Sequence, residues 1–104
     1  MPNIKFNYLY RDAANYKKHG SVIFDNPNNI ELSEVETLIR SKLIDGQWFY
    51  ADEWALPELF LETVDFRADP TWHEFEEVEY SDDVEIQFIA IEKFKALLEK
   101  SDGI

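Results

Sequence analysis

Residues 33–46 constrain the fold more than any other part of the sequence, because they carry the clearest helical pattern in the chain. Ser33 and Glu36 stand at the spacing of a capping box, in which each side chain hydrogen-bonds to the backbone N–H of the other residue. Gly46 is placed to end the helix in a left-handed conformation. The apolar residues that share one face at helical spacing are Val35, Leu38, Ile39 and Leu43. The segment therefore predicts an amphipathic helix that packs on a sheet.

The N-terminal part of the chain predicts a β-hairpin. Apolar residues alternate with polar ones from Ile4 to Tyr10, which is the period of a half-buried strand. A second β-branched and aromatic run covers residues 21–25, after a polar connection at residues 13–20. The Asn-Pro-Asn-Asn sequence at residues 26–29 ends this second strand, because proline lacks an N–H and asparagine favours turns.

The C-terminal part predicts a second hairpin and a second helix. Apolar and polar residues alternate over residues 74–80 and 84–88, on either side of the turn residues 81–83. In an alternative assignment, Asp82 caps one long helix. The apolar residues at helical spacing after this point are Ile91, Phe94, Leu97 and Leu98. The predicted class is therefore α+β: an antiparallel sheet of about four strands with two helices on one face, in ββα-ββα order.

The segment between the two halves is rich in aromatic residues and has no clean period. Residues 48–50 (Trp-Phe-Tyr) are too short and too apolar for anything but buried extended chain or the wall of a pocket. Pro57 interrupts any long helix in residues 52–60, so we expect a loop with one short helical turn there. Residues 65–71 are polar and contain a proline, which predicts a second surface connection.

Length, composition and the absence of targeting patterns predict one cytoplasmic domain. At 104 residues the chain has the common size of a domain, so residues 1–104 are interpreted as a single acidic α+β domain. It contains no cysteine, which excludes a disulfide framework, a thiolate metal site and a thiol nucleophile. The N-terminus lacks the pattern of a secretory signal, and no apolar run approaches the ~18 residues of a membrane span. We therefore expect a cytoplasmic protein that does not enter a membrane.

The net charge of −12 is concentrated in the middle of the sequence. Residues 31–92 hold eighteen of the 22 acidic side chains and three of the ten basic ones. Such a field repels nucleic acid and anionic membranes and favours a basic protein partner. The small basic and aromatic group near the N-terminus is interpreted as a solvated hairpin with core tyrosines; it comprises Tyr8, Tyr10, Arg11, Tyr16, Lys17 and Lys18.

His73 is the residue with the most suggestive chemistry. It stands among carboxylates, so with Asp69, and with Asp65 or Glu74 nearby in sequence, it could bind a divalent metal or act as a general base. The alternative, which we favour, is a structural histidine beside an aromatic cluster. No glycine-rich phosphate loop and no G-x-S-x-G motif is present, so no catalytic residue and no cofactor is assigned.

Aromatic and acidic residues coincide in the middle of the chain and predict a surface for a protein partner. Tryptophan and tyrosine combine large area with few rotamers and dominate binding hot spots. The candidate partner-binding residues are Trp48, Tyr50, Trp54, Trp72, Glu76 and Glu77. In the alternative interpretation, the aromatic residues fill the core of a small domain under its long loops.

Three short motifs share their order and spacing with a known group of sequences. They are Leu43-Ile44-Asp45-Gly46, Leu56-Pro57-x-Leu59 and Trp72-His73-Glu74-Phe75. The chain thereby resembles small uncharacterised bacterial proteins with an LIDG…LPxL…WHEF pattern, over roughly residues 40–80 and the C-terminal helix. The resemblance implies a bacterial origin and a compact α+β unit, and it assigns no catalytic role to any residue.

Three functional hypotheses follow from these observations. The first is a non-catalytic interaction protein that binds and neutralises a basic protein partner, by analogy with immunity proteins and antitoxins. The alternative is a small metal-binding domain or metal-dependent enzyme centred on His73. The third is a subunit that forms homo-oligomers through its hairpin edges.

Overall fold

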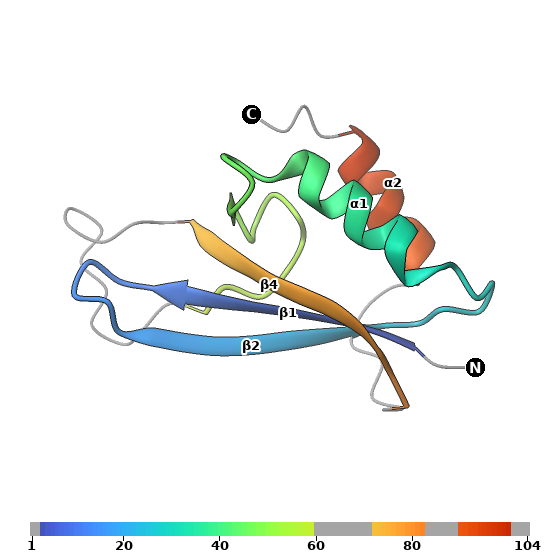
Figure 1. Cartoon of the computed structure of the whole chain (residues 1–104), viewed down its shortest axis with the longest axis horizontal. Helices are drawn as coiled ribbons and strands as arrows, with labels where there is room; N and C mark the ends of the chain where they lie inside the picture. Colours follow the sequence, from blue (N-terminus) through green and yellow to red (C-terminus); the bar gives the residue numbers. More distant parts are fainter. Residues whose placement is uncertain (1–2, 60–71, 83–89, 101–104) are drawn as a thin grey trace.

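The protein is an α+β structure in which a curved antiparallel sheet carries two helices on one side (Figure 1). The computed structural model describes residues 3–59, 72–82 and 90–100. The elements are β1 (Asn3–Arg11), β2 (Lys17–Phe24), α1 (Leu32–Lys42), β3 (Trp48–Phe49), β4 (His73–Ser81) and α2 (Ile91–Lys100). The α+β class, the antiparallel sheet and the two helices confirm the prediction.

The sheet is built around β1, which pairs antiparallel with β2 on one side and β4 on the other. The strand order is β2-β1-β4-β3. The alternation predicted for β1 is confirmed, since Ile4, Phe6 and Tyr8 are all buried.

The predicted start of β2 was wrong. The connection assigned to residues 13–20 is much shorter, because Lys17 to Gly20 already pair with Arg11 to Tyr8. These residues lie at the end of the hairpin, beyond the helices, and their side chains are mostly exposed. They therefore show no alternation of apolar and polar residues. The strand forms there through its backbone pairing with β1, and apolar periodicity does not report it.

The third and fourth strands differ from those expected. The strand predicted at residues 74–80 is β4, but the strand predicted at residues 84–88 lies outside the described residues. The fourth member of the described sheet is the two-residue strand β3, which pairs with Glu74 and His73 of β4. The extended chain predicted at residues 48–50 therefore joins the sheet edge.

Helix α1 has the predicted apolar face, with Val35 and Ile39 buried, but not the predicted ends. Its N-cap is Glu31 and no side chain caps it, so the capping box at Ser33 was wrong. Glu36 instead accepts a hydrogen bond from Arg40 one turn later. Gly46 has the positive φ expected of it (70°), but it lies in the turn between Ile44 and Trp48, after the helix has ended at Lys42.

Helix α2 is attached to the sheet at its first residue. The Ile91 N–H donates to the Asp25 carbonyl at 2.8 Å, directly after β2. The turn that follows Asp25 is closed by the buried side chain of Asn26, which bonds to both the N–H and the carbonyl of Ile30. An ion pair between Lys95 and Glu34 joins the two helices. The predicted helical face is confirmed by the burial of Ile91, Phe94 and Leu98.

The core between sheet and helices is aromatic, and Phe6 lies at its centre. Its ring contacts five others, with centroid distances of 5.3 to 6.3 Å; these belong to Tyr8, Phe49, Trp54, Phe75 and Phe94. Trp54 also stacks on Phe49, with centroids 4.5 Å apart. Contacts between aromatic rings stabilise a fold beyond the contribution of the apolar area that they bury, so this cluster is a main source of stability.

The segment at residues 50–59 is tied to the inner face of the sheet by specific polar contacts. The Tyr8 hydroxyl donates to the Pro57 carbonyl at 2.6 Å. The Leu59 N–H donates to Nε2 of His73 at 2.9 Å. The Leu59 side chain fills the space over Gly20, where an added Cβ would lie 2.7 Å from a methyl group. Successive hydrogen bonds between residues three apart form one turn at residues 50–55, in agreement with the short helical turn expected in this loop.

Candidate functional site

The outer face of the sheet, opposite the helices, carries an acidic strand with an irregularity at its middle. In the pairing of β1 with β4, Tyr8 lies opposite Phe75 and Asn7 lies opposite Glu77, so Glu76 is an extra residue. This is a β-bulge, which breaks the strict alternation of side chains along a strand. As a result, the consecutive residues Glu76 and Glu77 both line one groove.

This groove, which we call the acidic groove, has a volume of about 390 Å³. Its lining includes Asn7, His19, Ser21, Glu76, Glu77 and Glu79, from β1, β2 and β4. The three carboxylates share the groove with hydrogen-bonding side chains, and no lysine or arginine occurs among the described residues that line it. The groove is therefore a region of negative potential on the outer face.

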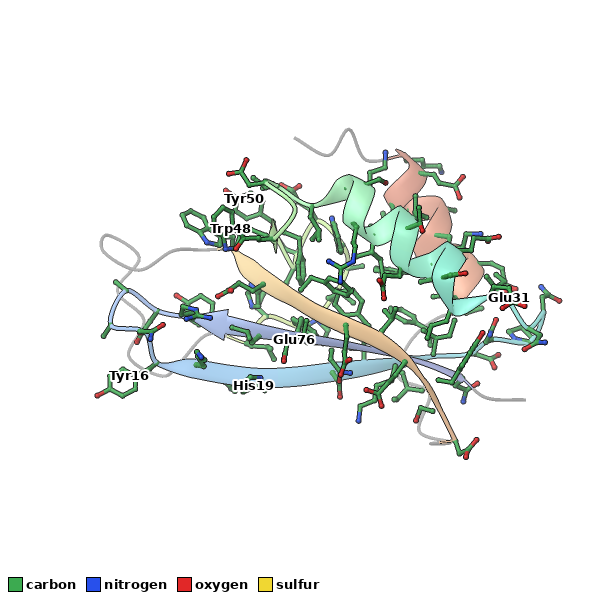
Figure 2. All side chains as sticks on the ribbon, in the orientation of Figure 1. Tyr16, His19, Glu31, Trp48, Tyr50 and Glu76 are labelled. Carbon is green, nitrogen blue, oxygen red and sulfur yellow. The ribbon has the colours of Figure 1, made fainter. Side chains whose placement is uncertain are left out.

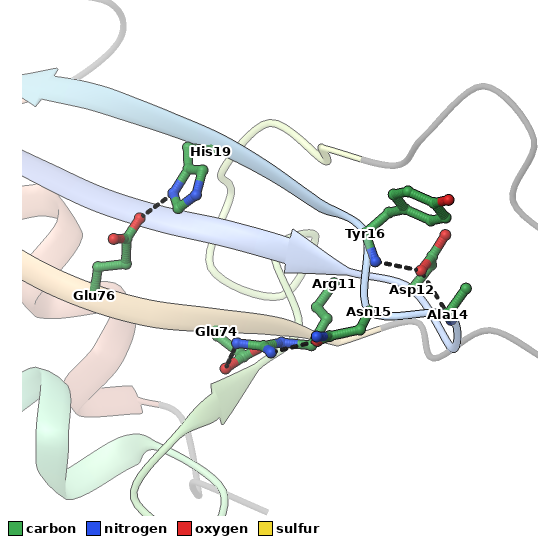
Figure 3. Close-up of polar contacts among 8 residues, drawn as sticks. All are labelled: Arg11, Asp12, Ala14, Asn15, Tyr16, His19, Glu74 and Glu76. Carbon is green, nitrogen blue, oxygen red and sulfur yellow. Dashed lines mark hydrogen bonds and ion pairs between the residues drawn. The ribbon is translucent and has the colours of Figure 1, made fainter.

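Two of the carboxylates are held by side chains from other strands. Nδ1 of His19 lies 2.9 Å from Oε1 of Glu76, and this pair spans β1, which runs between their strands (Figure 3). The Asn7 amide donates to Oε2 of Glu79 at 2.9 Å. Leu9 is opposite His19 in the register and, although it lies on the outer face, is only 7% exposed.

A second hollow lies where β1 ends and β4 begins, and we call it the tryptophan hollow. Its volume is about 420 Å³, and its lining includes Arg11, Asp12, Gln47, Trp48, Trp72 and Glu74. The indole rings of Trp48 and Trp72 are in contact, with centroids 6.0 Å apart. Arg11 donates from Nε to Oε2 of Glu74 at 2.6 Å and from Nη2 to Oε1 at 3.4 Å (Figure 3).

The residues predicted to bind a partner fall into four places. Trp48 and Trp72 come together in the tryptophan hollow, and Glu76 and Glu77 come together in the acidic groove. Trp54 is 3% exposed and packs in the core. Tyr50 is half-buried and lies near Trp48, beside the start of β4 (Figure 2).

His73 lies in the core, with its ring against Tyr8, Tyr10 and Phe49. Its Nε2 accepts the Leu59 N–H, which fixes this nitrogen as the unprotonated one in the neutral ring. Burial lowers the pKa of His73 to about 4, although the nearby Asp52 carboxylate opposes this effect. The imidazole is therefore neutral at neutral pH.

Within the described ranges, no three His, Cys, Asp or Glu side chains lie close enough together to hold a metal ion. Asp69, the other predicted ligand, lies outside the described residues. No helix in the described part of the chain is both long and apolar enough to cross a membrane.

Sequence reasoning missed several residues of both sites. Glu79 lines the acidic groove on the same strand as Glu76 and Glu77. The others are Asn7, Arg11 and His19, which belong to strands distant in sequence from β4. Strand register brings them together, and a complete prediction of β2 would have placed His19 opposite Leu9 on the outer face. The bulge at Glu76 has no local signal in the sequence.

No family model, no curated protein and no solved structure matches the chain.

Proposed function

We propose that this protein is a non-catalytic interaction domain that binds a basic protein partner through the acidic groove. The observation that carries the proposal is the bulge at Glu76, which adds a carboxylate to a face that already holds Glu77 and Glu79. An arginine or lysine side chain entering the groove would meet three carboxylates and no lysine or arginine among the described lining residues.

The charge of the whole chain supports the same partner. A net charge of −12 steers a basic protein toward the domain and opposes nucleic acid and anionic membranes. Opposite charges on the two proteins speed their association. Because exposed charges are screened over about 8 Å at physiological salt, the complex weakens as salt is added. By analogy with immunity proteins and antitoxins, we propose that the domain inhibits its basic partner and that it does so in the cytoplasm.

The groove itself can be tested separately from the overall charge. A groove variant carries Glu76→Gln, Glu77→Gln and Glu79→Gln, which keep the shape and hydrogen-bonding capacity of each side chain but remove three negative charges. A control variant carries Glu53→Gln, Glu58→Gln and Glu99→Gln, at exposed positions outside the groove. Both variants have the same net charge.

The experiment is affinity capture of basic proteins from a bacterial lysate on immobilised wild type and on each variant, at low and high salt. We expect one basic protein to be retained by the wild type and the control variant and to be lost from the groove variant. Retention should weaken as salt rises. If both variants lose the protein equally, net charge and not the groove is responsible; if neither does, the groove is not the binding site.

A further inference from the structure

The tryptophan hollow differs from the acidic groove in shape and composition. Its walls include two indole rings from different elements, Trp48 in β3 and Trp72 just before β4. Trp72 is 39% exposed, which is a large apolar area to leave in contact with water. The volume of about 420 Å³ falls within the range of about 300–1,000 Å³ typical of small-ligand sites.

The polar side of the hollow is a fixed hydrogen-bonding surface. The Arg11 guanidinium is held by Glu74 and, through Nη1, by the Asn15 side chain at 2.5 Å (Figure 3). Each terminal nitrogen of the guanidinium carries two N–H groups and donates one of them in these contacts. Each Glu74 oxygen accepts one of the Arg11 hydrogen bonds and has a further lone pair. Donors and acceptors thus lie side by side and are held in place before any ligand arrives.

The charged side chains of the hollow already have partners within the protein: one carboxylate is paired with the guanidinium, and the other is hydrogen-bonded to backbone N–H groups. Glu74 is paired with Arg11, and Oδ1 of Asp12 accepts the N–H groups of Ala14 and Tyr16 at 3.0 and 2.9 Å. A cationic ligand would meet the guanidinium, and an anionic ligand would meet two carboxylates. A neutral ligand can use the remaining donors and acceptors without separating the ion pair.

We propose that the tryptophan hollow binds the ring of a neutral sugar. A sugar ring has a C–H face that packs on indole and hydroxyl groups that both donate and accept hydrogen bonds, which matches the two sides of the hollow. Adjacent hydroxyls can accept from Arg11 and donate to Glu74, while the C–H face lies on Trp72. This site is independent of the acidic groove, so it does not rest on the proposal of a basic protein partner.

Saturation-transfer NMR is the direct test, because it reports which ligand protons touch the protein. The probes are methyl glycosides of glucose, galactose and N-acetylglucosamine and their neutral disaccharides, with arginine amide and glucuronate as charged probes. We expect transfer to the ring C–H protons of at least one neutral probe. Trp72→Ala should lower its affinity at least ~10-fold, or about 1.4 kcal/mol. Arg11→Lys, which keeps the charge but loses the planar fork, should also weaken binding.

Tyr16→Ala is the matched control, since Tyr16 is a more exposed aromatic residue (70%) that does not line the hollow. It should leave sugar binding unchanged, and circular dichroism checks that all variants keep the fold. Absence of transfer to every neutral probe would overturn the proposal. So would binding that survives Trp72→Ala, or a hollow that takes arginine amide or glucuronate in place of the neutral probes.

Discussion

The two faces of the sheet are made from the same strands but are held together differently. On the inner face, Phe6 and Tyr8 of β1 are at most 1% exposed and contact other aromatic rings. On the outer face of the same strand, Asn7 and Arg11 are half-buried and contact carboxylates of β4. Burying a large apolar side chain contributes about 1.5–3 kcal/mol, whereas an exposed ion pair contributes about 0–1 kcal/mol. The inner face therefore stabilises the fold, and the outer face is free to carry recognition.

The largest expected effect is on the inner face, from Phe6→Ala. Removing the ring at the centre of the aromatic cluster should lower the free energy of unfolding by about 3–5 kcal/mol, since the surrounding rings cannot close the cavity. Asn7→Ala, at the next residue but on the outer face, should cost less than about 1 kcal/mol because it removes one exposed hydrogen bond. Urea unfolding of both variants measures the difference. Comparable losses would contradict the division between the faces.

The next effect is a dependence of stability on pH that arises from His73. The pKa of His73 is about 4 in the folded chain and about 6.5 when unfolded, so below pH 6.5 the unfolded chain binds a proton that the folded chain does not. Stability should therefore fall as the pH drops from about 6.5 to about 4, and the gap between the two pKa values corresponds to about 3 kcal/mol. Protonation also breaks the hydrogen bond from Leu59.

His73→Gln isolates this contribution, because the amide does not titrate and can still accept the Leu59 N–H. Unfolding of wild type and variant should be compared at several pH values between 4 and 8. The difference between them should change across this window, since the carboxylates common to both proteins cancel. A difference that stays constant would mean that His73 takes up its proton equally in both states.

A smaller effect on the inner face comes from Tyr8→Phe. Burial raises the pKa of Tyr8 to about 12, so the hydroxyl stays protonated and donates to the Pro57 carbonyl throughout the neutral range. Removing it leaves that carbonyl without this donor and should cost about 1–2 kcal/mol. Tyr16→Phe, at an exposed position, should change the free energy of unfolding by less than about 0.5 kcal/mol. Equal effects would show that the Pro57 contact does not stabilise the segment at residues 50–59.

The sequence was most informative where apolar residues recur with a fixed period. The strand at Ile4–Tyr10 and both helices could be predicted because one face of each is buried in a continuous core. The start of β2 could not, because Lys17 and Lys18 have no buried face to report. Both ends of α1 were also mispredicted, since the helix begins before Ser33 and ends at Lys42, before Gly46. Local capping patterns compete with tertiary contacts.

The candidate sites could be predicted only in part, for a related reason. The aromatic and acidic residues singled out in the sequence include four that line the hollow or the groove. Composition does not tell, however, which face of the sheet a side chain occupies. Trp54 turns into the core, while Glu76 is brought beside Glu77 by a bulge that depends on the pairing of β1 with β4. The partners of the carboxylates come from β1 and β2, more than fifty residues earlier in the chain.

The smallest effect on stability is expected on the outer face, from neutralising the acidic groove. Glu76→Gln, Glu77→Gln and Glu79→Gln remove repulsion among neighbouring carboxylates and keep side chains that can still bond to His19 and Asn7. The free energy of unfolding should change by less than about 0.5 kcal/mol, with a slight gain at low salt. The same variant should lose a basic partner. Loss of binding without loss of stability would show that these carboxylates serve recognition, whereas a large loss of stability would show that both faces of the sheet hold the fold together.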